Sequence, residues 1–164
     1  MKTSLIKHLA FFAIVAFIGI MVNSCGEDTV TNNTAPTTFS INGTVTFVDT
    51  TRVYTGGSYN VSCFTTWPPA GAPSGIAIMT PVLSGGVYTA TYSITGLSNG
   101  KYFLASAWTK EPYVTGGNYV LGTKGCDTNS IFICMPDSIA VSGSNVTTVD
   151  FKSFIDTSNA LVNF

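Results

Sequence analysis

Apolar and polar side chains alternate along much of this chain, the pattern of β-strands whose two faces lie in different environments. The clearest stretch is residues 87–108. From Val87 to Ile94, aromatic and aliphatic residues occupy every second position and threonine or serine most of the others. The Asn99-Gly100 step is typical of a tight reversal, and a second apolar run follows from Tyr102 to Trp108. We therefore predict two antiparallel strands that share a turn over residues 87–108.

Other segments predict further strands. Residues 39–48 place four large apolar side chains on one face, with Gly43 on the same face, where a close neighbour or a bulge is common. Residues 58–67 alternate in the same way. The run 76–79 ends at Pro81, which favours an edge strand. Residues 139–151 contain a Ser-Gly-Ser-Asn turn between two apolar groups and predict a closing hairpin.

These strands define the expected architecture. About seven short strands, frequent turn signals and no convincing helix predict an all-β fold, an antiparallel β-sandwich. Residues 38–152 are expected to form this domain, which at its size buries about 65% of its unfolded surface. Residues 68–75 contain three prolines and two glycines and exclude regular pairing there. The apolar residues of the tail, 153–164, fit both packing on the domain and extension of a sheet edge.

The first 24 residues have the organisation of an export signal. Lys2 and Lys7 precede an apolar run of fourteen residues, 9–22, which is shorter than the roughly 18 to 20 residues that span a bilayer as a helix. The sequence Val-Asn-Ser-Cys at residues 22–25 resembles the bacterial lipobox, in which the cysteine is lipidated and becomes the mature N-terminus. The resemblance implies that Cys25 carries the lipid. An uncleaved membrane anchor with an incidental cysteine is the alternative.

The lipobox also implies a location. We expect a protein of the bacterial cell envelope, held at the outer membrane by lipid on Cys25, with residues 1–24 removed and residues 25–37 acting as a flexible tether. The Glu27-Asp28 pair resembles the acidic patch that follows the lipidated cysteine in surface-exposed lipoproteins. Exposure at the cell surface and a periplasm-facing orientation both fit the sequence.

Charge and composition exclude several functions. Only 9% of the residues are charged, against about 25% in a typical domain. The single histidine, His8, leaves with the signal, which excludes Ser-His-Asp and Cys-His nucleophiles and every zinc site that needs histidine. Five bases and eight acids remain, a net charge of about −3, with no basic patch for nucleic acid. No motif indicates a cofactor. We expect no catalytic residue, no metal site and no enzymatic activity.

Three cysteines remain once Cys25 is assigned to lipid. In an exported protein the eight-residue separation of Cys126 and Cys134 favours a disulfide between them, with Cys63 left as a small buried side chain on its strand. Two alternatives remain open, a bond from Cys63 to one of the others and a fully reduced set.

Aromatic residues are the remaining candidates for a site. Tyr88, Tyr92 and Tyr102 share strand phase with aliphatic neighbours and are expected in the core. Trp67 lies at the proline-rich segment, and Tyr113 and Tyr119 lie in a glycine-rich excursion over residues 109–125. If exposed on one face, these three side chains are suited to stack on sugar rings or another small ligand.

Three stretches resemble the carboxypeptidase regulatory-like, transthyretin-like Ig-type domain found in many bacterial envelope proteins: residues 41–47, 92–108 and 139–151. The central motif of that family, an aliphatic residue, Gly-Leu, a short turn and Gly-x-Tyr, is matched by Ile94, Gly96, Leu97, Gly100 and Tyr102. The resemblance spans residues 40–151 and implies a prealbumin-like, Ig-like sandwich rather than an activity. The proline-rich segment and the cysteine-bounded insertion depart from the family pattern.

The sequence therefore leads to two functional hypotheses. The first is a lipid-anchored envelope protein that acts as a non-enzymatic structural or interaction module, with the membrane and envelope proteins or glycans as partners. The second is a carbohydrate or small-ligand binding module that uses Trp67, Tyr113 and Tyr119.

Overall fold

The computed structural model describes residues 37–49, 53–112, 117–126, 134–159 and 162–163. The chain divides into two compact units, Met1–Ala35 and Pro36–Phe164. All of the described residues belong to the second unit. They form ten β-strands and one short 3-10 turn, so the predicted all-β class is confirmed.

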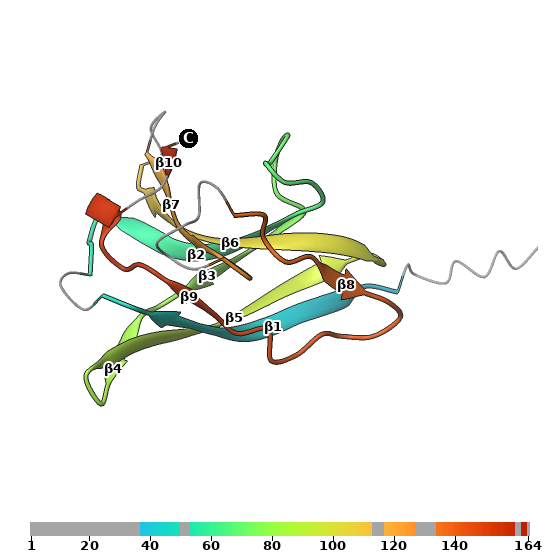
Figure 1. Ribbon diagram of the computed structural model, residues 1–164, viewed down its shortest axis with the longest axis horizontal. Helices are drawn as coiled ribbons and strands as arrows, with labels where there is room; N and C mark the ends of the chain where they lie inside the picture. The colour runs from blue at the N-terminus through green and yellow to red at the C-terminus, as the bar shows by residue number, and fades with distance from the viewer. Residues whose placement is uncertain (1–36, 50–52, 113–116, 127–133, 160–161, 164) are drawn as a thin grey trace, which may run out of the picture. The chain divides into compact units, whose positions relative to one another are not determined.

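The strands form two sheets, which Figure 1 shows as two layers. The smaller sheet has the order β4 (Val82–Ser84), β5 (Val87–Leu97), β1 (Phe39–Phe47) and β9 (Phe151–Ser153). The larger sheet has the order β10 (Val162–Asn163), β7 (Asn118–Thr123), β6 (Gly100–Lys110), β2 (Gly57–Phe64) and β3 (Gly75–Met79), and β8 (Ile139–Val141) pairs with one end of β6. The pairing within both sheets is mainly antiparallel, as in a β-sandwich.

One apolar core lies between the sheets. Alternate residues of β1, β5, β2 and β6 supply it, so the inward faces predicted for these strands are confirmed. The buried members from these four strands are Ile41, Val45, Phe47, Ala90, Tyr92, Ile94, Leu97, Tyr59, Val61, Cys63, Tyr102, Leu104 and Trp108. A buried polar contact joins the sheets as well, because the Ser106 hydroxyl of β6 lies 2.6 Å from the Ser153 hydroxyl of β9.

The predicted hairpin over residues 87–108 is wrong. β5 pairs with β1 and β4 in the smaller sheet, whereas β6 pairs with β2, β7 and β8 in the larger one. Gly96, not Gly100, has the positive φ, at 78°, and a register irregularity opposite β1 brings Leu97 into the core with Ile94. The Asn-Gly step therefore lies in a connection that crosses from one sheet to the other. Leu97 before it and Tyr102 after it are both buried in the core that the two sheets share.

The predicted closing hairpin is also wrong. β8 pairs with β6, while β9 pairs in parallel with β1 in the other sheet. Between them the chain runs beside β1, where the Asn145 side chain accepts a hydrogen bond from Ser40 N at 2.9 Å and Asp150 accepts one from Thr44 N at 2.8 Å. Backbone hydrogen bonds to β1, from Asn42 N to Val146 O and from Val149 N to Asn42 O, act with these side-chain acceptors in place of the predicted hairpin ladder.

Two strand boundaries differ from the sequence pattern. β2 ends at Phe64 rather than Trp67, because the prolines at 68 and 69 stop regular pairing and Thr65 is exposed. β4 was not predicted. Gly85 and Gly86 both have positive φ, 59° and 81°, as a two-residue hairpin turn between β4 and β5 requires. The prediction of β3 as an edge strand is confirmed.

Close packing holds the segment before β9 against β1. A Cβ on Gly43 would overlap the Val149 carbonyl group, so only glycine fits this point on the inward face. The Tyr92 hydroxyl donates to the same Val149 carbonyl at 2.6 Å, and burial raises the pKa of Tyr92, which keeps this proton in place. The tail continues the core through Ile155, which is fully buried, and β10 pairs with β7.

Candidate functional site

A cavity of about 360 Å³ lies on the outer face of the larger sheet, under the loop of residues 65–74, here called the proline loop. Outward-facing residues of β2, β6 and β7 form its floor: Asn60, Ser62, Phe64, Ala105, Thr109, Asn118 and Val120. The proline loop and β3 form its wall with Trp67, Pro69, Gly71, Pro73 and Ile76. The volume is at the lower end of the roughly 300 to 1,000 Å³ that small-molecule sites occupy.

Strand alternation and the proline loop create this hollow. Three inward positions of β6 carry the large core residues Tyr102, Leu104 and Trp108, whereas Ala105 and Ala107 occupy outward positions and leave space above the sheet. The loop returns to its starting point because Ser74 N donates to Cys63 O at 2.8 Å. Its prolines restrict the backbone, so the loop holds the wall of the cavity in a defined position above the small side chains of β6.

The polar side chains of the floor form one hydrogen-bonded row. The Ser62 hydroxyl donates to Asn60 Oδ1 at 3.2 Å, Asn60 Nδ2 donates to Thr109 Oγ1 at 3.0 Å, and the Thr109 hydroxyl donates to Asn118 Oδ1 at 2.9 Å. We call these four residues the polar row. It crosses three neighbouring strands, and Thr109 and Asn118 are direct register partners on β6 and β7.

The wall of the cavity is mainly apolar and aromatic. The rings of Phe64 and Trp67 meet edge to face, with centroids 6.4 Å apart. This packing supports the Trp67 ring while leaving it partly exposed. Ile76 is 57% exposed beside it. The site therefore combines an apolar side with an ordered polar side, the usual composition of a small-ligand pocket.

Among the described residues that line the cavity there is no Asp, Glu, Lys, Arg, His or Cys. The polar row thus offers hydrogen bonds from neutral amides and hydroxyls without a formal charge. The described part of the chain also holds no group of three or more His, Cys, Asp or Glu side chains able to bind a metal ion.

The three aromatic residues proposed from the sequence are not brought together as a set. Trp67 lines the cavity. Tyr119 faces the opposite side of its sheet, where its ring lies 5.6 Å from that of the buried Trp108. Tyr113 lies outside the described residues, as does Cys25.

The polar row was missed by the sequence reasoning. Asn60, Ser62 and Thr109 occupy the positions between core residues on their strands, where polar side chains usually face water. In this sheet Asn60 and Ser62 are only 7% and 8% exposed. Polar residues on a strand that leads into a loop of three prolines were the signal in the sequence that could have indicated a site here.

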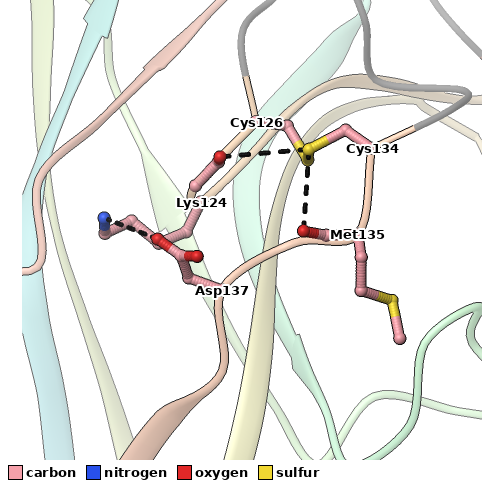
Figure 2. The surroundings of a disulfide bond; sticks show 6 residues. Lys124, Cys126, Cys134, Met135 and Asp137 are labelled. Atoms are coloured by element: carbon pink, nitrogen blue, oxygen red, sulfur yellow. Dashed lines mark hydrogen bonds and ion pairs between the residues drawn. A yellow bond between two sulfur atoms is a disulfide. The ribbon is translucent and has the colours of Figure 1, made fainter.

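Cys126 and Cys134 form a disulfide in the structure, the pairing favoured by their spacing, and Cys63 is free and buried. Figure 2 shows this bond, with Lys124 and Asp137 forming a second link between the same two stretches of chain. Asp137 N donates to Lys124 O at 2.9 Å, and the two side chains form an ion pair at 3.8 Å. The carbonyl contacts drawn to the Cys134 sulfur are not hydrogen bonds, since a disulfide sulfur has no proton to donate.

No described helix is long and apolar enough to cross a membrane. No family model, curated protein or solved structure matches the chain.

Cysteine chemistry gives a test of this part of the structure. Burial raises the pKa of Cys63 to about 11, so at neutral pH almost none of it is the reactive thiolate. In the folded protein, iodoacetamide is expected to leave Cys63 unmodified, and denaturant is expected to make it react. Peptide mapping without reduction should then find Cys126 joined to Cys134. A crosslink to Cys63, or its fast alkylation in the native state, would contradict the arrangement.

Proposed function

We propose that this chain is a lipid-anchored, non-enzymatic binding module of the bacterial cell envelope, which takes a small ligand into the cavity under the proline loop. The observation that carries the proposal is the cavity itself, with Trp67 in its wall and the polar row across its floor. A purely structural module has no need of an ordered polar row beside a partly exposed aromatic ring.

The nature of the lining supports a binding role rather than catalysis. Ser62 and Thr109 supply the only hydroxyls among the described residues of the lining. Each donates its proton to a side-chain amide oxygen, and an amide is too weak a base to activate a nucleophile. The described lining holds no carboxylate or imidazole, so none of these residues is suited to transfer a proton to or from a ligand.

The anchor is proposed from the N-terminal sequence. The lipobox-like residues 22–25 identify Cys25 as the lipidated residue, and residues 25–37 would separate the domain from an outer-membrane surface. A tethered binding module can hold its ligand near that surface whether it faces the periplasm or the medium.

The family resemblance also remains a proposal at the level of fold. Two facing sheets around one core are in keeping with an Ig-like, transthyretin-like domain. The motif residues Ile94, Leu97 and Tyr102 are buried near the link between the sheets. These residues pack in the core and turn the chain. The resemblance to the family therefore supports the proposed fold, and the proposal of a ligand depends on the cavity alone.

Replacement of Cys25 by Ser tests the anchor. Because the acyl chains would be carried by this sulfur, C25S is expected to abolish incorporation of labelled fatty acid and to prevent lipoprotein-type processing of the signal. Matched replacement of Cys63 by Ser controls for the loss of a thiol and should leave labelling unchanged. Normal acylation and membrane fractionation of C25S would contradict the proposal.

Replacement of Trp67 by Ala tests the cavity. Because the ring is partly exposed, W67A is expected to change the free energy of unfolding by about 1 kcal/mol or less, yet to abolish binding to a panel of immobilised neutral glycans, acidic glycans and proline-rich peptides. W108A removes a ring from the core and is expected to lower the free energy of unfolding by about 3 to 5 kcal/mol. Urea unfolding and the panel provide the two measurements.

Leu83→Ala is the matched control for binding, because Leu83 is an exposed apolar residue on the other sheet. It should bind as the unchanged protein does. The proposal fails if the unchanged protein binds no member of the panel, or if W67A binds as well as the L83A control.

A further inference from the structure

We infer that the ligand of this cavity is a neutral sugar ring, held with its C–H groups against the aromatic wall and its hydroxyl edge along the polar row. The inference rests on the proposed binding function and specifies its ligand class. Four observations carry it: the two-sided lining, the absence of charge, the unused hydrogen-bonding capacity of the row and the limited volume.

The lining matches the two-sided surface of a pyranose. Such a ring presents C–H groups on its faces and hydroxyls around its rim, so it fits a site that is apolar on one side and polar on the other. Here Trp67 and Phe64 stand on one side, and Asn60, Thr109 and Asn118 on the other. A wholly apolar ligand would bury Asn60 and Thr109 without replacing their contacts with water, at a cost in free energy.

Charge disfavours ionic ligands. No lining residue in the described part of the chain carries a charge, and a carboxylate or phosphate placed beside these residues would lose hydration without gaining an ion pair from them. An uncharged ligand meets no such cost. This excludes acidic sugars and phosphorylated compounds as the preferred ligands.

The polar row retains hydrogen-bonding capacity. Its internal bonds use one Nδ2 proton of Asn60 and none of the Nδ2 protons of Asn118. Neither side chain gives its spare protons to any other described residue. The Ser62 oxygen keeps its acceptor positions while its proton goes to Asn60. Donors and an acceptor thus lie on one fixed row, which suits hydroxyls that donate and accept at once. Within a run of prolines the backbone offers carbonyl acceptors only, since proline lacks an N–H.

The volume also limits the ligand. At about 360 Å³ and partly open to solvent, the cavity has room for the end or a short stretch of a glycan rather than for a folded partner. The ordered row and the proline-restricted wall reduce the conformational cost of binding, which favours recognition of a single small ring.

The test measures binding of the full chain, purified in a detergent without a sugar headgroup, by calorimetry with defined probes. The probes are neutral oligosaccharides of glucose, galactose, mannose and N-acetylglucosamine, their uronic-acid and sulfated counterparts, and a hexaproline peptide. At least one neutral probe is expected to bind, with an affinity insensitive to salt, and its acidic counterpart at least tenfold more weakly.

Two substitutions test the polar row. Thr109→Val keeps the shape of the side chain and removes the hydroxyl between Asn60 and Asn118, and N118A removes the free amide donors. Each is expected to weaken binding of the neutral probe about three- to tenfold, the effect of one lost hydrogen bond. Thr91→Val, at an exposed position on the outer face of the other sheet, is the matched control and should leave the affinity unchanged.

The outcomes separate this inference from the proposed function. Binding of hexaproline or of acidic glycans alone, abolished by W67A, would overturn the neutral-sugar inference and leave the binding module standing. Neutral-sugar binding that T109V and N118A do not weaken would overturn the role of the polar row. Absence of binding to every probe would overturn both.

Discussion

A single apolar core between two sheets is the constraint on which the rest of this structure depends. Each sheet turns one face inward, and the large apolar side chains on the inward faces of β1, β5, β2 and β6 belong to one cluster. Because the inward faces are filled by large side chains, the outward faces are free to vary in size and polarity. The candidate site uses that freedom on the larger sheet.

The crossing between β5 and β6 determines where the site forms. Since β6 leaves the sheet of β5, it becomes a central strand of the larger sheet, flanked by β2 and β7. Outward side chains of three adjacent strands therefore meet, and small residues on β6 leave a low floor between polar neighbours. The proline loop, tied back to β2 by the bond from Ser74 N to Cys63 O, supplies the wall.

The sequence predicts the elements of this fold better than their partners. Alternation located β1, β2 and β5 and assigned their inward faces, because burial acts on each strand locally. Pairing between strands depends on the whole core. An Asn-Gly step was therefore mistaken for a hairpin, although burial of Leu97 and Tyr102 takes the two strands into different sheets.

The candidate site was predictable only in part. Trp67 beside three prolines suggested an aromatic ring held at a loop, and the structure places it in the cavity wall. Tyr119 lies in a glycine-rich stretch that also suggested exposure, but its ring lies on the core side of β7. Polar residues of β2 beside a proline-rich loop were the one signal for the polar row. The row itself could not be predicted, because nothing in the spacing of Asn60, Thr109 and Asn118 indicates that β2, β6 and β7 are neighbours.

The two tryptophans of this chain offer the most direct measurement of the central claim, that the cavity under the proline loop is where ligand binds. Trp67 lines the cavity, whereas Trp108 lies in the core between Tyr54 and Tyr119. In ¹⁵N-labelled protein each indole N–H gives its own NMR signal. On titration with the neutral oligosaccharides, the account predicts that the Trp67 signal shifts progressively while the Trp108 signal stays in place. Equal movement of both signals, or a stationary Trp67 signal, would contradict it.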